Sequence, residues 1–315
     1  MSGAMRARVR VPCSTSNLGA GFDCVGIALD RWLDASVEVR VHAGPAWSID
    51  RGGTLAQLAD VPAADDYLAV GFRAACDAAG VETPDGVAFT ARSEIPVARG
   101  LGSSAASLVA GAMLARAALG LALTDADLVT IAAGIEGHPD NVSPIVLGGA
   151  VLAVPRPRDG AVTRYAFDAL DVHPSLGIAL GVPDFETSTP AMRAVRPPTL
   201  AYRDAVLAAG KAAALVRGLA TGDGALLAHA LDDVLHVPFR RALVRGYDAV
   251  VTAACAAGAY GATLSGSGST ILALGPRTSM PAVAEAMRRA WADVGVVAEG
   301  SIAQVAGGAA VVDAV

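Results

Sequence analysis

A glycine-rich turn that leads directly into an apolar segment constrains the fold of this chain more than any other feature. Residues 95–106 read Ile-Pro-Val-Ala-Arg-Gly-Leu-Gly-Ser-Ser-Ala-Ala, and small or aliphatic side chains continue beyond them. The segment contains Ser107 and Arg116, so we expect a buried helix over residues 103–119 rather than a membrane span over 105–123. The sequence therefore predicts a helix that begins directly after two glycines.

Such a turn can bind an anion without a lysine. The first amides of a helix have no partner within it, the helix dipole adds partial positive charge, and Gly100 and Gly102 allow close approach of a ligand. An ordinary serine-capped helix is the alternative. The string also matches Gly-x-Gly-x-x-Ala, but a dinucleotide site requires an acidic residue after a second strand, about 20 residues on. Asp125 and Asp127 lie there in a helix-start motif, which excludes that site.

The scarcity of lysine limits the ways in which this chain can bind phosphate. Of the 24 basic residues, only Lys211 is a lysine. A Walker P-loop requires Gly-Lys-Ser/Thr, and Lys211 is followed by alanine, so a P-loop NTPase is excluded. Lys211 is flanked by alanines on an expected helix. We interpret it as a solvated side chain with no part in turnover.

The composition indicates a folded, acidic protein. The chain has 315 residues, 53% of them hydrophobic, and a formal net charge of −6. Its length predicts about two domains, its hydrophobicity excludes disorder, and its charge argues against nucleic acid as a partner. The four cysteines form no Cys-x-x-Cys pair, and the N-terminus lacks an apolar signal segment. We therefore expect a reduced, cytoplasmic protein without a zinc site.

The strand and helix patterns interleave without the regular alternation of a barrel, which favours an α+β fold. Residues 155–160 form a proline-rich turn cluster that predicts a boundary between an N-terminal domain, 1–160, and a C-terminal domain, 161–315. The expected strands are 6–12, 25–29, 35–41, 87–91, 148–154, 177–182, 261–264 and 270–274. The expected helices are 65–79, 103–119, 124–136, 202–221, 223–234, 246–257 and 281–294.

Three further segments contain reactive or ligating side chains. Residues 136–144, Glu-Gly-His-Pro-Asp-Asn-Val-Ser-Pro, gather oxygen ligands and hydrogen-bond donors in one loop. A carboxylate together with a hydroxyl and phosphate oxygens usually binds magnesium, whereas a solvated surface loop is the alternative. Residues 12–23 place Asn17 and Asp23 near two glycines, and residues 261–270 form a strand, a Gly-Ser turn and another strand. Taken singly, these last two segments are expected to be structural.

Taken together and in this order, the four segments resemble the motifs of the GHMP kinase superfamily. Residues 14–23 and 136–141 resemble its homoserine kinase family in particular. The sequence departs from the family pattern at Cys13, Ala20 and Ser269, none of which is expected to react. The resemblance implies a two-domain kinase. Its N-terminal ATP-binding domain would resemble domain 2 of ribosomal protein S5, and its C-terminal domain would be a ferredoxin-like α/β sandwich.

The resemblance also implies ligands and site residues. ATP and Mg²⁺ are the expected cofactors, with the metal on Ser104 and Glu136. The residues expected to bind ATP are Pro96, Arg99, Gly100, Leu101, Gly102, Ser103, Ser104, Ala105, Gly266, Ser267 and Gly268. Those expected to bind an amino-acid substrate are Asp23, Asn17, His138, Asn141, Arg193 and Arg240.

By this resemblance the two arginines hold the substrate carboxylate, which suits a guanidinium fork. A surface ion pair is the alternative for each of them. Family members often carry an asparagine near the start of the helix expected at residue 65. This chain has none there, so the adenine contacts stay open.

The implied reaction is transfer of the γ-phosphoryl group of ATP to the side-chain hydroxyl of L-homoserine, a step in threonine biosynthesis. Asp23 would either accept the hydroxyl proton or pair with the substrate ammonium. Phosphorylation of another small alcohol, of the mevalonate or sugar type, and nucleotide binding without turnover are the alternatives. No membrane partner is expected, and a homodimer interface stays open.

Overall fold

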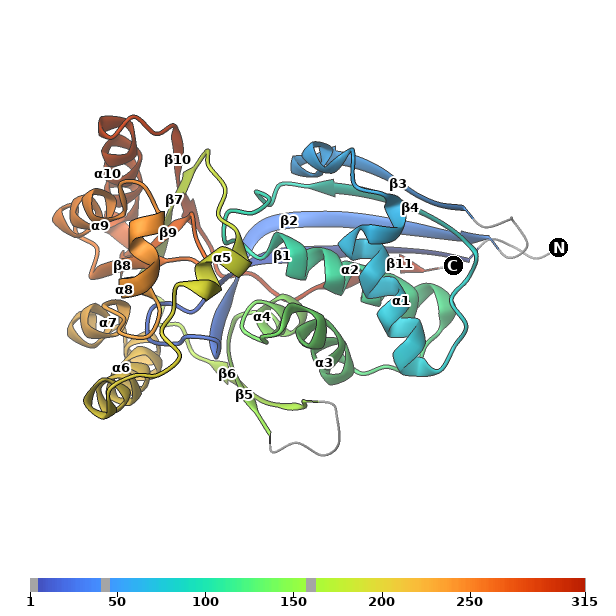
Figure 1. The fold of residues 1–315 in the computed structure, drawn as a ribbon, viewed down its shortest axis with the longest axis horizontal. Coiled ribbons are helices and arrows are strands. Elements are labelled where there is room, and N and C mark those ends of the chain that lie inside the picture. Colours follow the sequence, from blue (N-terminus) through green and yellow to red (C-terminus); the bar gives the residue numbers. More distant parts are fainter. Residues whose placement is uncertain (1–4, 41–45, 157–162, 315) are drawn as a thin grey trace.

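The computed structural model describes residues 5–40, 46–156 and 163–314, which form two β-sheets with helices packed on them (Figure 1). The larger sheet contains β1 (Met5–Ser16), β2 (Val25–Arg40), β3 (Ala46–Gly53), β4 (Gly86–Ser93), β5 (Ala150–Pro155), β6 (Tyr165–Leu170) and β11 (Ala310–Ala314). Its strand order is β11-β1-β2-β4-β3, with β5 paired to β2 and β6 paired to β5. Both halves mix strands and helices, so the α+β prediction is confirmed.

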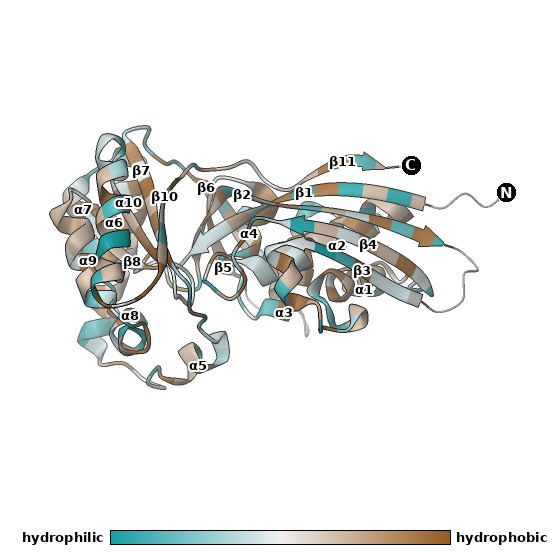
Figure 2. Cartoon of the chain, turned by 90° about the horizontal axis from the view of Figure 1, so that it is seen from above, coloured by the Kyte–Doolittle hydropathy of each residue, from teal (hydrophilic) through white to brown (hydrophobic). Residues whose placement is uncertain are grey.

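β1 begins with the alternation expected of a half-exposed strand. Its arginines at positions 6, 8 and 10 are exposed, whereas Val9 and Val11 are buried. Figure 2 shows this alternation as bands of hydrophilic and hydrophobic residues along the strand. The buried face is covered by a helical layer that consists of α1 (Tyr67–Ala79), α2 (Ser103–Leu119), α3 (Asp125–Glu136) and α4 (Val142–Leu147).

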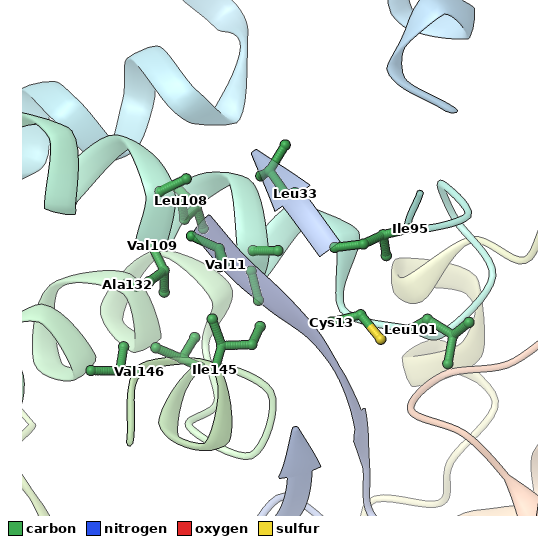
Figure 3. Close-up of a cluster of buried hydrophobic side chains, with 14 of the residues drawn as sticks. Val11, Cys13, Leu33, Ile95, Leu101, Leu108, Val109, Ala132, Ile145 and Val146 are labelled. Atoms are coloured by element: carbon green, nitrogen blue, oxygen red, sulfur yellow. The ribbon is translucent and has the colours of Figure 1, made fainter. Parts of the chain in front are cut away.

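The helix α2 lies at the centre of this layer. All its residues from Ala105 to Ala115 are buried, as expected for a helix that is apolar on every side. Leu108 and Val109 lie close to Val11 of β1 and Ala132 of α3 (Figure 3). None of the helices in the described residues has the length and apolarity needed to cross a membrane. The prediction of a buried helix over residues 103–119 is confirmed.

The smaller sheet contains β7 (Leu176–Pro183), β8 (Gly261–Leu264), β9 (Ile271–Pro276) and β10 (Ala298–Ala303), in the order β10-β7-β9-β8. It is buried on both faces along β7, β8 and β9, whereas its edge strand β10 is partly exposed. Ile178 and Leu180 of β7 join the core shared with α6 (Tyr202–Thr221) and α7 (Gly224–Leu231). Ala179 points to the other core, under α9 (Tyr247–Ala256) and α10 (Met280–Asp293). Two short helices, α5 (Thr189–Ala194) and α8 (Val237–Arg240), connect these elements.

The sequence does not predict several of the strands. β3, β6, β10 and β11 are absent from it, and β11 is exposed at every described position, so it has no apolar alternation to detect. The two strands predicted at 25–29 and 35–41 are one strand, β2, within the described residues. Residues Asp30 to Arg31 in its middle are polar, which conceals its continuity.

The first sheet also receives strands from the second half of the chain. Both β6 and β11 follow residue 160 in the sequence, and they pair with β5 and β1. Chain beyond residue 160 therefore contributes to both sheets. The predicted boundary between residues 160 and 161 falls within residues 157–162, which lie outside the described residues, and it stays a prediction.

The interpretation of Lys211 as a solvated side chain is wrong. Lys211 on α6 is 7% exposed. Its Nζ donates to the carbonyl oxygen of His229 at 2.9 Å, to the carbonyl oxygen of Asp232, and to the Asp232 carboxylate at 3.0 Å. The ammonium group therefore binds the carbonyl end of α7, where helix carbonyls lack intrahelical partners and the dipole favours a cation.

Candidate active site

A cavity of about 400 Å³ lies at the N-terminus of α2 and receives residues from both halves of the chain. The sequence-predicted residues that line it are Asn17, Asp23, Gly100, Gly102, Ser103, Ser104, Glu136, His138, Asn141, Arg193, Arg240, Gly266 and Ser267. All four predicted segments therefore meet at one place. The fold brings together residues from the end of β1, α2, the end of α3, α5, α8 and the turn between β8 and β9.

The glycine-rich turn ends at a helix N-terminus that no side chain caps. Gly102 is the N-cap of α2, with φ of 69°, and no side chain hydrogen-bonds to the first turn. Gly100 has φ of 76°, and a Cβ there would lie 2.2 Å from the carbonyl oxygen of Ser265. Both positions therefore require glycine. The alternative of a serine-capped helix is wrong, and Ser103 and Ser104, in the first turn whose amides lack helical partners, line the cavity as potential anion ligands.

Some residues expected to bind ATP do not line the cavity; they are Pro96, Arg99, Leu101, Ala105 and Gly268. Leu101 and Ala105 are fully buried and belong to the core, as Figure 3 shows for Leu101. The guanidinium of Arg99 donates to the carbonyl oxygens of Pro183 at 3.0 Å and Asp184 at 2.6 Å. Its side chain therefore connects the glycine-rich turn to the end of β7, and it is directed away from the cavity.

Ser104 and Glu136 form the oxygen cluster nearest to these amides. The Ser104 hydroxyl donates to Oε1 of Glu136 at 2.6 Å, which joins the first turn of α2 to the last turn of α3. Hydroxyl and carboxylate oxygens are hard ligands, and magnesium is usually bound by one or two protein carboxylates plus phosphate oxygens and waters. The donor set and its place beside the uncapped amides fit this ion.

The loop after α3 is buried, so the alternative of a solvated surface loop for residues 136–144 is wrong. His138 is 8% exposed and Asp140 is 1% exposed. His138 Nδ1 lies 2.5 Å from Oδ1 of Asp140, and its Nε2 lies 3.9 Å from Glu136. Burial lowers the pKa of His138, but the hydrogen bond and the charge of Asp140 outweigh burial and leave that pKa raised. Asp140 therefore orients the ring of His138 within the cavity wall.

The two asparagines are held by the polypeptide around them. Asn17 Nδ2 donates to the carbonyl oxygen of Gly266 at 2.9 Å, and its Oδ1 accepts from the amide of Asp23 at 3.0 Å. Asn141 accepts from the Ser14 hydroxyl at 2.8 Å and donates to Ser16 Oγ at 2.9 Å. These hydrogen bonds connect the end of β1 to the β8–β9 turn and to the start of α4. They hold the two asparagines in place in the cavity lining.

Asp23 and Arg193 form an ion pair inside the cavity. The Arg193 guanidinium donates to the two carboxylate oxygens of Asp23, at 2.8 Å and 3.3 Å, across 170 residues of sequence. Both side chains are about one-third exposed, so the pair is accessible to a ligand from the cavity. Asp23 also has φ of 56°, in the left-handed region that residues other than glycine rarely adopt.

Arg240 is one of the largest fully buried side chains of the molecule, at 2% exposure, and the surface ion-pair alternative is wrong for it. Its Nε donates to the carbonyl oxygen of Met192 at 2.9 Å, and its Nη1 donates to Nδ1 of His236 at 3.1 Å. Burial, together with the charges of Arg196 and Arg193, lowers the pKa of Arg240 to about 10. The guanidinium is still charged at neutral pH, and no carboxylate within the described residues pairs with it directly.

Comparison with known proteins identifies the family. One family model, described as GHMP kinases N terminal domain, matches residues 66–149, and a second, GHMP kinases C terminal, matches residues 212–293. The chain belongs to the GHMP kinases. The N-terminal match includes the glycine-rich turn and Glu136, whereas Asp23 and Arg193 lie outside both matched ranges. The predicted GHMP kinase architecture is confirmed.

Relatives of known activity cover nearly the whole chain. A homoserine kinase of Picosynechococcus sp. is 38% identical over 91% of this chain and 93% of its own length. A homoserine kinase of Trichormus variabilis is 39% identical over 94% of this chain and 95% of its own length. The crystal structure of homoserine kinase from Cytophaga hutchinsonii has a TM-score of 0.84 and 26% identity, and covers 98% of this chain and 97% of that chain.

The GHMP kinase cavity has walls that the sequence analysis misses. They are formed by Thr187, Ser188 and Thr189, before and at the start of α5, and by Leu58 and Tyr67. Tyr67 lies at the helix start where the family resemblance places an adenine contact, whereas no local motif marks the others. Asp140 is different, because it lies within the segment 136–144 and its residue type was visible there. Only its burial next to His138 reveals its function in orienting that ring.

Proposed function

We propose that this GHMP kinase is a homoserine kinase, which transfers the γ-phosphoryl group of ATP to the side-chain hydroxyl of L-homoserine and forms O-phospho-L-homoserine for threonine biosynthesis. The observation that carries the proposal is the charge arrangement of the cavity. Asp23 and two arginines, Arg193 and Arg240, line one end. The uncapped amides of α2 and the Ser104–Glu136 pair line the other. A zwitterion with a hydroxyl fits between these ends.

At the phosphate end, the amides of residues 103–105 bind the phosphate oxygens, with the partial positive charge of the α2 N-terminus behind them. Gly266 and Ser267, in the turn opposite, close the phosphate site from the C-terminal half. Ser104 and Glu136 would hold Mg²⁺. When bound, this ion supplies neutralisation of the charge that the phosphoryl group carries.

At the amino-acid end, Asp23 binds the substrate ammonium, and Arg193 and Arg240 bind the carboxylate. Asn17, His138 and Asn141 line the space between, where the side-chain hydroxyl points to the γ-phosphorus. In the ligand-free pocket Arg193 engages both oxygens of Asp23. A zwitterion can insert into this pair without leaving either charge unpaired, because it presents an ammonium to Asp23 and a carboxylate to Arg193.

These contacts favour ammonium binding over proton abstraction for Asp23. A carboxylate with both oxygens on a guanidinium is a weak proton acceptor, because protonation would break a charge-assisted pair. Phosphoryl transfer has a loose transition state, so orientation and charge neutralisation contribute most of the catalysis. The hydroxyl then requires positioning rather than a dedicated base.

The adenine base packs against apolar side chains next to the start of α1, where Asp65 and Asp66 also line the cavity. Leu58, Val61, Tyr67 and Val97 line that part, and the chain has no asparagine there. We therefore propose recognition of the base by apolar contact and stacking rather than by an asparagine side chain. Tyr67 is 47% exposed at the mouth, which suits a side chain that stacks on a ligand.

A substrate panel tests the proposal. The purified protein is incubated with Mg-ATP and L-homoserine, mevalonate or galactose, and ADP release is measured in a coupled assay. We expect turnover with homoserine only, because galactose offers no charge to the two arginines or to Asp23, and mevalonate has a carboxylate but no ammonium for Asp23. Equal turnover with mevalonate or galactose would favour another small-alcohol kinase, and binding of ATP without ADP release would favour a non-catalytic relative.

The proposal includes the cellular compartment of the enzyme and leaves its oligomeric state open. We propose a cytoplasmic enzyme, since its four cysteines, Cys13, Cys24, Cys76 and Cys255, are free thiols in the structure. A homodimer stays open as a prediction. Size-exclusion chromatography with light scattering measures the assembly directly.

A further inference from the structure

A buried histidine outside the cavity lining connects the two substrate-binding elements. His236 is fully buried, immediately before α8. Its Nδ1 accepts from Nη1 of Arg240 at 3.1 Å, and its Nε2 lies 3.3 Å from the carbonyl oxygen of Gly19. Its ring stacks on Phe22, with centroids 4.7 Å apart and an interplanar angle of 22°. One imidazole thus contacts both the loop that ends at Asp23 and the guanidinium of Arg240.

The hydrogen-bond partners determine the tautomer of His236. Arginine only donates, so Nδ1 must be unprotonated, and the carbonyl of Gly19 only accepts, so Nε2 must carry the hydrogen. Burial lowers the pKa of His236 to about 4, which keeps the ring neutral. The Asp233 carboxylate, 3.6 Å from Nε2, accepts from the amides of His236 and Val237 and so anchors the backbone.

The orientation of Arg240 follows from these contacts. Its Nε is bound by the carbonyl of Met192, and its Nη1 by His236. Its Nη2 has no hydrogen-bond partner among the described residues, and Arg240 lines the cavity. The guanidinium plane is therefore fixed by two acceptors from different segments, which leaves one edge for a ligand. Phe22 also lies 5.3 Å from the guanidinium carbon, on the same loop as Asp23.

We infer that His236 is a positioning residue. Through Nδ1 it orients Arg240, whereas Nε2 and the ring hold the imidazole against the 17–23 loop, so the placement of the substrate carboxylate site depends on the Nδ1 contact. The inference rests on the proposed function of Arg240 and Asp23. It assigns specificity for the amino-acid part of the substrate to a side chain that touches no substrate atom.

Two substitutions separate the two contacts of the ring. In His236→Asn the side-chain oxygen can occupy the position of Nδ1 and still accept from Arg240, because both atoms are bonded to Cγ. In His236→Gln the amide nitrogen can occupy the position of Nε2 and still donate to Gly19, but the acceptor for Arg240 is lost. Each variant is assayed for KM and kcat with homoserine and with ATP, after its folding is checked by circular dichroism and thermal unfolding.

We expect His236→Gln to raise the KM for homoserine about tenfold to a hundredfold, because the buried guanidinium loses an acceptor. His236→Asn should stay within about threefold of the unmodified enzyme, and the KM for ATP should stay within about threefold in both. In an Arg240→Met background, His236→Gln should add less than about threefold, because its effect passes through Arg240. His229→Gln, at an exposed histidine of α7, is the matched control.

Equal increases of the homoserine KM in the Asn and Gln variants would overturn the inference, as would an equal rise of the KM for ATP. A full His236→Gln effect in the Arg240→Met background would do the same. If neither variant folds, the histidine acts on folding rather than on Arg240, and the inference is wrong. Absence of homoserine turnover in the unmodified enzyme would instead overturn the proposed function.

Discussion

The two ends of the cavity are built from different parts of the polypeptide. At the phosphate end, the groups offered to a ligand are the amides of residues 103–105 and the Ser104–Glu136 pair, all from α2 and the end of α3. At the amino-acid end they are charged side chains such as Asp23 and Arg193, which come from segments 170 residues apart. The first end combines backbone amides with one side-chain pair from neighbouring helices, whereas the second consists of charged side chains from distant segments.

Because of this difference, one end recognises phosphate in general, whereas the other selects the acceptor substrate. Uncapped amides and a helix dipole stabilise any phosphate chain, so they carry no information about the acceptor alcohol. Paired charges at a fixed spacing accept a zwitterion and leave an uncharged alcohol with unsatisfied partners, which costs binding free energy. We therefore expect substitutions at the phosphate end to change kcat, and substitutions at the amino-acid end to change the KM for homoserine.

The largest effect is expected at the phosphate end. Glu136→Ala removes the carboxylate that accepts from Ser104, so kcat should fall by about a thousandfold or more, to the point where turnover is abolished. Coupled ADP release measures it. Glu82→Ala, which removes an exposed carboxylate after α1, is the control and should match the unmodified enzyme. Retention of more than a tenth of kcat by Glu136→Ala would contradict the magnesium assignment.

Asp23→Asn should give the next largest effect and tests the amino-acid end. The neutral amide cannot pair with the substrate ammonium, so the KM for homoserine should rise about a hundredfold while the KM for ATP stays constant. Steady-state kinetics with each substrate varied in turn provides both values. A loss of kcat with little change in KM would show that Asp23 acts as a base, and would make the two ends of the cavity less distinct.

The buried network at the amino-acid end should make folding stability sensitive to acid. His236 has a pKa of about 4 in the folded protein, against about 6.5 unfolded, because burial disfavours its charged form. The unfolded state binds the proton more tightly, so the neutral ring contributes its full share to the free energy of unfolding above pH 6.5. As the pH falls from about 6.5 to 4, the free energy of unfolding decreases by about 3 kcal/mol in all.

Urea unfolding of the unmodified enzyme and of His236→Asn between pH 4 and 7 measures this effect. The slope of unfolding free energy against pH should be shallower in the variant. Asp233, Arg240 and Asp23, the charged groups that contribute to the pKa of His236, are present in both proteins. The raised pKa of His138 adds a slope of opposite sign to both, so it cancels in the comparison. Parallel curves would contradict a neutral, buried His236.

The smallest effect is expected for Lys211→Ala, which tests the support beneath the amino-acid end. Lys211 binds the carbonyl end of α7, and the residue after His229 in that helix, Ala230, accepts a hydrogen bond from the amide of Ala20 at 3.0 Å. Loss of the ammonium should lower the free energy of unfolding by about 1–3 kcal/mol, because buried carbonyls lose a charged donor. Turnover should stay within about threefold, since no atom of Lys211 reaches the cavity.

Thermal and urea unfolding, paired with the ADP assay, measure the two quantities separately. Arg217→Ala removes an exposed cation from the same helix and should change stability by less than about 0.5 kcal/mol. A Lys211→Ala variant as stable as the unmodified enzyme would restore the interpretation of a solvated lysine. A large loss of turnover at unchanged stability would show that Lys211 contributes to homoserine binding or catalysis.

The phosphate end could be predicted from the sequence because its determinants are local. Two glycines before a helix, a pair of serines and a glutamate at the end of the next helix are visible as residue types in order. The amino-acid end could be predicted only through family resemblance. Asp23 and Arg193 carry no mutual signal in the sequence, and His236 lies in an apolar segment where a histidine has no evident partner.

By itself, the sequence determined that a buried helix follows a glycine-rich turn, because helix formation and burial depend on neighbours within a few residues. It also determined that phosphate binding cannot rely on a P-loop lysine. Only the tertiary structure decided that Lys211 of α6 is buried against the end of α7, that Arg240 is desolvated, and that His236 connects Arg240 to the 17–23 loop. Desolvation and hydrogen bonding between distant segments depend on the packing of whole elements, which no single stretch of sequence encodes.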